Sequence, residues 1–496
     1  MKAPLISKRR IHRRERQHGV TMVLVALAMV AIIAIAALSI DVITLYLAKE
    51  EAQRSADAAA LAAANVLSLS GITGDPTNQS GNWKQICGPD DGTNGLATRM
   101  AKAVANQNLI GGAPVTAPTV TYSSAGTSSP DCTSLNGTGF GVNPLVTVQL
   151  SRANLPSFFS RIWGNSGTTV TATATAEAFN PSNSANSGNT TLGAIVPVQP
   201  RCVKPWVVPN QDPLHNTSGA VGTCTGGSGG NCAKFVSLAD GSIVNQGISL
   251  GGTGVGGVIG ETFWLSPDCH VSGSSCSGPN QRIGTPQANY STGPHMQGLP
   301  DLLFVPGQVG TPVIGVPSCT TGNPFEEAIE GCDQSTNYTC GVLPASGGTN
   351  VVDLSENPDT PTSNGVSCLI HQATNSDVSG PTGQDYFNAF KAPSSYPFQI
   401  YAGSSNPAVG PGLASGTPIS VSSSIVSLPI YDETTPLGTG TTPVTFVGFL
   451  QVFINATDQW GNVNVTVLNV AGCSNSAVSS PVIANSPIPV RLITPP

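Results

Sequence analysis

Cysteines have the clearest covalent chemistry in this sequence: the chain contains 12 of them, and none lies in its first 86 positions. Six of them form three pairs whose members are seven or eight positions apart in Gly/Ser-rich or turn-like contexts. An even number of cysteines in an exported region favours disulfides over catalytic thiols, although the connectivity stays open. We predict that each pair closes a short loop. The pairs are Cys224 with Cys232, Cys269 with Cys276, and Cys332 with Cys340.

The cysteines and histidines do not form a metal-binding pattern. A zinc site needs four ligands, commonly two CxxC pairs or Cys and His at matching spacing. The nearest combinations are Cys269 beside His270 and Cys368 three positions before His371, and neither supplies four ligands. We therefore predict no metal and no cofactor.

No pattern in the sequence predicts catalysis. Residues 252–257 match G-x-G-x-x-G, but the next residues lack the helical period that a dinucleotide site requires, so we interpret them as a glycine turn. The phosphate-binding loop G-x-x-x-x-G-K-[ST] is missing, and although residues 226–230 and 247–251 match the letters G-x-S-x-G, we interpret neither run as a hydrolase elbow. What remains is four isolated histidines and two pairs of acidic residues without a partner base, and we predict no catalytic residue among them. The histidines are His215, His270, His295 and His371, and the acidic pairs are Glu326 with Glu330 and Asp432 with Glu433.

The composition indicates a turn-rich, exported protein. Only 9% of the 496 residues are charged, against about 25% in an average soluble domain, while Gly and Pro number 56 and 40. A hydrophobic content of 39% argues against classical disorder. The length allows two or more domains of roughly 100–200 residues. The fold class that we expect is α+β, largely β outside the membrane.

One apolar segment is long enough to cross a membrane. Residues 20–40 contain no charge, Gly or Pro, and 21 residues of helix span roughly 30 Å. Seven basic residues precede the segment, whereas Lys49 and Arg54 lie beside Glu50, Glu51 and Asp57 after it. The positive-inside rule therefore places the N-terminus in the cytoplasm and the body outside it. The alternative is a cleaved signal peptide, for which Ala34 and Ala36 supply a small-x-small site.

The charge of the body disfavours nucleic acid as a partner. After Arg16 the chain has 20 − 7 = 13 basic and 27 − 1 = 26 acidic residues, because only Glu15 precedes that point. The expected partners are instead the lipid bilayer and other membrane proteins. The oligomeric state stays open.

The apolar helix is expected to continue beyond the membrane, because no Gly or Pro occurs between Val20 and Gly71. Within the extension, one face repeats at spacings of three and four residues, as in a seam between two helices. This face includes four alanines, which permit close approach of a second helix. The seam alanines are Ala52, Ala56, Ala59 and Ala63, and Leu45 and Val66 flank them. An Ala-rich helix with small residues on every face is the alternative interpretation.

Residues 17–64 also contain a recognisable motif. It consists of Gly19, Ile40, Asp41, Val42, Tyr46, Leu47, Gln53 and the block Ala56, Asp57, Ala58, Ala59, Ala60, Leu61, Ala62. In these residues the segment resembles the TadE/TadG-like proteins of bacterial Flp (Tad) pilus assembly, and residues 144–179 look like the downstream half of TadG-like proteins. The resemblance implies a structural pilus-assembly component whose N-terminal helix contacts other pilus-assembly proteins. Processing after Gly19 would call for Glu five positions later, where this chain has Leu24, and is not predicted.

The remaining patterns divide the chain into five parts. We expect a basic tail (1–19), the membrane helix with its extension (20–70), a small α+β unit (71–179), a linker (180–191) and a disulfide-rich β region (192–496). In the α+β unit, helices are expected over residues 96–110 and 154–163, and strands over 145–150 and 168–179. In the β region the clearest strands are residues 444–454 and the run around Val463, Val465 and Val467.

Together these features predict a single-span protein of the bacterial inner membrane with a periplasmic or extracellular body that takes part in Flp pilus assembly. A surface adhesin that uses the β region is the alternative function. An exported hydrolase is the weakest alternative.

Overall fold

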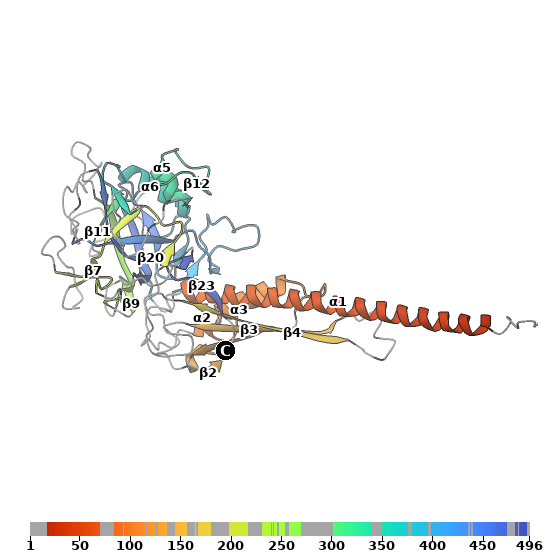
Figure 1. Ribbon diagram of the computed structural model, residues 1–496. Coiled ribbons are helices and arrows are strands. Elements are labelled where there is room, and N and C mark those ends of the chain that lie inside the picture. Colours follow the sequence, from red (N-terminus) through yellow and green to blue (C-terminus); the bar gives the residue numbers. More distant parts are fainter. Residues whose placement is uncertain are drawn as a thin grey trace, which may run out of the picture.

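The computed structural model describes residues 17–69, 84–92, 94–115, 117–124, 127–135, 144–155, 164, 167–179, 198–216, 231–239, 241, 243–245, 248–252, 257–268, 301–334, 336, 338, 350–374, 379–394, 398–434, 437, 440–473, 482–484 and 486–493. Figure 1 shows a long helix, a small helix-and-sheet unit along its C-terminal half, and a larger β body at its C-terminal end. The expected α+β class with a mostly β body is confirmed. Residues 1–16 of the predicted tail (1–19) and the whole predicted linker (180–191) lie outside the described residues.

The long helix α1 spans Gln17–Leu69, 53 residues or about 80 Å at 1.5 Å per residue. Its continuity confirms the predicted extension beyond the apolar segment. The N-terminal half projects away from the rest of the molecule, and the C-terminal half is embedded in it (Figure 1).

The small unit consists of α2 (Lys84–Cys87), α3 (Leu96–Gln107), the 3-10 helix η2 (Cys132–Ser134) and a five-stranded antiparallel sheet of order β2-β1-β3-β4-β23. Its strands are β1 (Thr119–Ser124), β2 (Thr127–Ser129), β3 (Leu145–Leu155), β4 (Thr168–Ala178) and β23 (Val490–Ile493). The predicted alternation is confirmed, since Val146, Val148 and Leu150 are buried on one face of β3. The helix predicted over 154–163 is wrong at its start: Asn154 and Leu155 continue the strand, and 156–163 are not described.

The C-terminal strand returns to the small unit, which the expected boundary at residues 180–191 did not anticipate. Strand β23 pairs with β4 from Val490 opposite Ala178 to Ile493 opposite Thr175. Across this pair, Arg491 Nε lies 2.8 Å from Glu177 Oε2. The Glu177 side chain is fully buried, and the Arg491 guanidinium also lies over the Phe179 ring at 4.2 Å. Residues more than 300 positions apart therefore complete one sheet.

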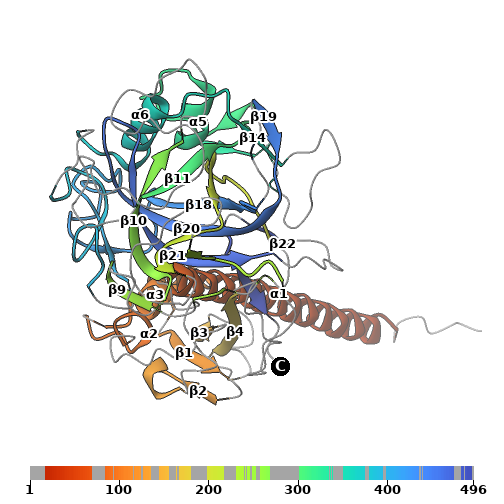
Figure 2. The same ribbon diagram turned by 90° about the vertical axis from the view of Figure 1, so that its left-hand side faces the viewer.

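The β body is built on a closed barrel of six strands, joined in the order β11-β6-β18-β20-β21-β10 with β10 pairing back to β11 (Figure 2). The strands are β6 (Trp206–Pro209), β10 (Ile259–Pro267), β11 (Asp301–Pro306), β18 (Ile425–Tyr431), β20 (Phe446–Thr457) and β21 (Val463–Gly472). The strands predicted at 444–454 and around Val463 are confirmed as β20 and β21. Asp458 shapes the turn between these two strands, because its Oδ1 accepts hydrogen bonds from the backbone amides of Trp460 and Asn462.

Shorter elements surround the barrel. The helices are α5 (Pro324–Glu330) and α6 (Asp359–Ile370). The strands are β5 (Val198–Pro200), β7 (Asp212–Asn216), β8 (Cys232–Ala233), β9 (Ile248–Gly252), β12 (Val313–Ile314), β13 (Cys332–Asp333), β14 (Val351–Asp353), β15 (Tyr386–Phe387), β16 (Ile400–Tyr401), β17 (Pro418–Ile419), β19 (Thr441–Pro443) and β22 (Val482–Ala484). Strand β9, which contains the first Gly of the 252–257 motif, lies parallel to β10, and residues 253–256 are not described.

Three disulfides join the described residues: Cys87–Cys132, Cys202–Cys332 and Cys319–Cys368. The predicted loop between Cys332 and Cys340 is wrong, because Cys332 is bonded to Cys202, 130 positions away. Short sequence separation was the wrong criterion, since closing the barrel brings distant strands together. Cys232 is also disulfide-bonded. The proposed partners Cys224 and Cys340, and the pair Cys269 with Cys276, lie outside the described residues.

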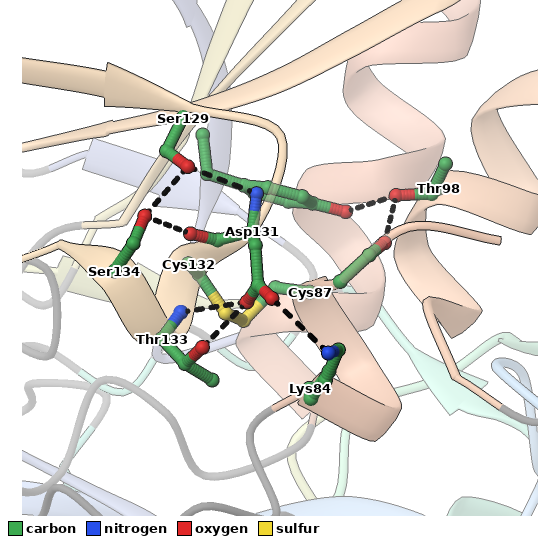
Figure 3. The surroundings of a disulfide bond; sticks show 10 residues. Lys84, Cys87, Thr98, Ser129, Asp131, Cys132, Thr133 and Ser134 are labelled. Carbon is green, nitrogen blue, oxygen red and sulfur yellow. Dashed lines mark hydrogen bonds and ion pairs between the residues drawn. A yellow bond between two sulfur atoms is a disulfide. The ribbon is translucent and has the colours of Figure 1, made fainter.

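The first of these disulfides fastens α2 to η2 in the small unit (Figure 3). Asp131 caps η2 by accepting a hydrogen bond from the Thr133 amide at 3.0 Å, and it also lies 3.6 Å from Lys84 Nζ. Close by, Thr98 Oγ1 on α3 lies 2.7 Å from the buried Tyr122 hydroxyl on β1. Covalent and polar contacts thus hold the outer edge of the small unit together.

The ion pair between β23 and β4 gives the first prediction. Arg491→Ala should lower the free energy of unfolding by about 1–3 kcal/mol, because it leaves the buried Glu177 carboxylate without its cation. The measurement is urea unfolding of the purified full-length chain in detergent. Arg54→Ala is the control, since Arg54 and Glu50 pair at 82% and 66% exposure and such pairs contribute little. Equal losses in both variants would contradict the assignment.

Candidate functional site

Protein covers very little of the first part of α1: between Val20 and Leu38, Ala37 is the one buried residue. Between Val20 and Leu38 every large apolar side chain is 54–78% exposed. Exposing so many apolar side chains to water is unfavourable by about 25 cal/mol for each Å² of apolar surface. This half of α1 is long and apolar enough to cross a membrane, and it is the one such helix among the residues that the structure describes. A lipid environment on all sides fits its surface.

The C-terminal half of α1 has the opposite surroundings. The seam alanines Ala52, Ala56, Ala59 and Ala63 are at most 1% exposed. The buried stripe begins earlier, at Ala37, Asp41 and Ala48, and continues to Val66 and Leu67. Over roughly three turns of the helix, between residues 37 and 48, the surroundings of α1 therefore change from open and lipid-compatible to those of a buried core helix.

Other parts of the same chain cover the seam. Helix α3 packs against α1 through Ala97, Ala101 and Ala105, all fully buried, and Ser55 Oγ donates to the Ala105 carbonyl at 3.5 Å. Leu96 is buried beside these alanines, and Met100 and Val104 are partly buried against the same core. Small side chains on both helices let the two backbones approach closely.

Strand β4 covers the adjoining face of α1. Lys49 Nζ donates to the Thr171 carbonyl, and Gln53 Nε2 donates to the Thr173 carbonyl at 3.2 Å. Glu51 accepts a hydrogen bond from the Gly111 amide at 2.8 Å. The face that the sequence assigned to a contact with a partner protein is thus filled by the chain itself.

The motif residues fall on two faces of α1. Ala56 and Ala60 are fully buried and Asp41 nearly so, while Gln53, Asp57 and Leu61 are partly buried. The outward side chains form an apolar patch directly after the span, which we call the collar. The collar consists of Ile40, Val42, Ile43, Tyr46 and Leu47. Gly19 lies within α1.

The C-terminal end of α1 is joined to the barrel by a buried hydrogen bond. Asn469 Nδ2 on β21 donates to the Ser68 carbonyl at 2.8 Å and to Gln451 Oε1 on β20 at 2.9 Å. The apolar core is continuous across this junction, from Ala48 on α1 to Val470 on β21. The C-terminal end of α1 is therefore fixed to the barrel.

A cavity of about 390 Å³ lies at the same junction, lined by Asn65 and Leu69 of α1 and by Lys204, Glu330 and Gln451 of the body. Burial lowers the pKa of Lys204 to about 7, although the charge of Glu330 counteracts this shift. Burial also raises the pKa of Glu330 to about 7, and the charges of Glu326 and Glu327 add to the shift. Lys204 Nζ donates to the Gly331 carbonyl at 2.7 Å.

Of the acidic pairs found in the sequence, Glu326 and Glu330 do share one helix, α5. Glu326 Oε1 and Oε2 accept hydrogen bonds from the amide and hydroxyl of Thr321, so this carboxylate holds the turn before the helix. Glu433 pairs with Lys234. These contacts give Glu326 and Glu433 structural roles.

One cluster of titratable residues was missed by sequence analysis. His215 Nδ1 lies 2.9 Å from Asp212 Oδ2 and 2.7 Å from Glu261 Oε1. Burial alone lowers the pKa of His215, but its close contacts with the two carboxylates and their negative charges outweigh burial and raise the pKa to about 10. Burial is the main cause that raises the pKa of Glu261 well above its ordinary value, and the negative charge of Asp212 is the second cause. The i, i+3 spacing of Asp212 and His215 was the available signal, but Glu261 is 46 positions away.

Comparison with known proteins supports the N-terminal assignment. Residues 19–66 match the protein family described as putative Flp pilus-assembly TadE/G-like. The resemblance of the N-terminal segment is therefore confirmed over a length that nearly equals α1, whereas the likeness of residues 144–179 stays a prediction. No curated protein and no solved structure matches the chain.

The buried seam gives the second prediction. Ala56→Leu with Ala59→Leu should destabilise the small unit by about 1–3 kcal/mol per site, because larger side chains force α1 away from α3 and β4. The melting temperature of the full-length chain in detergent measures the effect. Leucine is a good helix former, so any loss reports on packing.

Ala58→Leu with Ala62→Leu is the matched control, since both positions are only partly buried on the same turns of α1. If the two double variants melted alike, the seam would not be the packed face.

Proposed function

We propose that this protein is a structural component of Flp/Tad-type pilus assembly, anchored in the bacterial inner membrane by α1, with its N-terminus in the cytoplasm and its body on the opposite side. The observation that carries the proposal is the division of α1 into a bare apolar half and a half packed into the body. The family match of residues 19–66 favours a pilus-associated structural role over an enzymatic one.

The geometry favours a rigid support over a flexible tether. Helix α1 has no Gly or Pro between Val20 and Leu69, and its second half is packed along α3, β3 and β4. Sharp kinks in helices occur mainly at Pro, at Gly/Ser pairs or at inserted side chains. Movement of the membrane helix would therefore be passed to the barrel without a hinge in between.

The orientation follows from charge. Seven basic residues precede the span, and three acidic residues accompany the two basic residues that follow it. Tyr46 of the collar is 72% exposed at the expected end of the span, where tyrosine is favoured among lipid headgroups.

Contacts with other pilus-assembly proteins must use surfaces other than the seam. The collar and the lipid-facing surface of α1 are the exposed apolar regions on this helix. We propose that partner helices in the membrane pack on these surfaces, while the seam alanines keep the body in place.

The topology gives the third prediction. Protease added to the periplasmic side of spheroplasts should digest the body, and a label at the N-terminus should stay protected. Digestion of the barrel in inside-out vesicles, with the N-terminal label protected, would reverse the proposed orientation.

The role in assembly gives the fourth prediction. A deletion strain should lack surface pili, and expression of the full-length chain should restore them. A chain in which a cleavable signal peptide replaces residues 20–40 should not restore surface pili, because the body loses its membrane anchor. Normal pili with lost surface attachment in the deletion strain would support the adhesin alternative instead.

A further inference from the structure

Three side chains from two strands of the β body converge on one buried point. Asp212 and His215 lie on β7, and Glu261 lies on β10. Their side chains are at most 2% exposed. One ligand atom from each, Asp212 Oδ2, His215 Nδ1 and a Glu261 carboxylate oxygen, lies within 4.8 Å of the other two.

The hydrogen bonds of Asp212 orient it toward this point. Its Oδ1 accepts from the Leu214 amide at 3.0 Å, which leaves Oδ2 facing His215. Asn245 Nδ2 lies 3.2 Å from the same Oδ2. Outer hydrogen bonds of this kind orient carboxylates that bind metal ions.

Glu261 is the unexplained member of the cluster. Its Oε1 lies 2.7 Å from His215 Nδ1, but neither carboxylate oxygen receives a hydrogen bond of acceptable geometry in the described part of the chain, and the residue is fully buried. The nearby His215 Nδ1 carries at most one hydrogen, which cannot point at Asp212 and Glu261 together. A buried carboxylate without donors is strongly unfavourable unless a cation compensates it.

We propose that Asp212, His215 and Glu261 bind a divalent transition-metal ion, with Zn²⁺ as the best-fitting member of this class. Two carboxylates balance the charge of a divalent ion. The imidazole favours zinc over magnesium and calcium, which prefer ligand sets made only of oxygen. Tetrahedral bonds of about 2.0–2.1 Å would separate the ligand atoms by about 3.3 Å, so each side chain moves by a few tenths of an ångström.

The site would link the outer hairpin to the barrel. Strand β7 pairs with β8, and β10 pairs with both β21 and β11 of the barrel. A metal ion bound between β7 and β10 would therefore fasten the β7–β8 hairpin to the closed sheet. Metal binding to the folded state alone raises its stability by mass action.

The test uses the full-length chain, purified in detergent through a tag without histidine and stripped with EDTA. We expect it to take up one Zn²⁺ per chain in a calorimetric titration and to melt at a higher temperature with Zn²⁺ than with EDTA. Glu261→Gln should weaken Zn²⁺ binding at least tenfold, the lower end of the effect seen when groups around a metal are altered.

Glu327→Gln is the matched control, since Glu327 is a partly buried glutamate on α5 outside the cluster. It should bind Zn²⁺ like the unmodified chain. Absence of stoichiometric Zn²⁺ uptake by the unmodified chain, with equal melting in Zn²⁺ and EDTA, would overturn the proposal and leave the cluster as a proton-bridged network. Equal binding by Glu261→Gln would also overturn it. If that variant does not fold, the measurements on the unmodified chain decide.

Discussion

The architecture depends on one constraint: α1 must be compatible with two different surroundings along a single unbroken helix. Its first half presents apolar side chains in every direction, which only hydrocarbon or protein can accommodate. Its second half presents a stripe of alanines that is stable only when covered. A helix satisfies all of its interior backbone hydrogen bonds internally, so it can pass between the two surroundings without a break. The small unit is the cover that the second half requires.

The way in which this cover is completed ties the ends of the chain together. Strands β3 and β4 and helix α3 follow α1 closely in sequence, but β23 is contributed by residues 490–493. The sheet edge at β4 is therefore paired by residues that follow the whole β body in sequence. A contact of such high sequence separation has a large loop-closure entropy cost and makes the small unit and the barrel depend on each other. The buried Glu177, whose partner Arg491 comes from β23, adds to that dependence.

Local patterns in the sequence predict the elements well, but not their long-range partners. The uninterrupted run of α1, the alternation at Val146, Val148 and Leu150, and the valines of β21 each reflect a period that acts over a few residues. The Cys202–Cys332 bond, the return of β23 and the meeting of His215 with Glu261 depend on how the barrel closes. The spacing of hydrophobic residues along a single helix or strand does not encode how the barrel closes.

The low charge of the chain has a structural reason in the barrel. Strands β20 and β21 are buried along their whole length, so their polar positions must find partners inside the protein. Neutral side chains do this at a smaller desolvation penalty than charged ones. Asn455 Nδ2 donates to Asn464 Oδ1 at 3.0 Å and to Thr466 Oγ1 at 2.9 Å, which ties the register of the two strands to specific pairs.

Asn469 extends the same kind of contact from the barrel to the last turn of α1, through the Ser68 carbonyl. The last carbonyls of a helix have no partner within the helix, so this bond satisfies a group that burial would otherwise leave unpaired. An amide side chain in the barrel wall therefore attaches the last turn of α1 to the body. Because α1 contains no Gly or Pro after Val20, this attachment is continuous with the apolar N-terminal half of the helix.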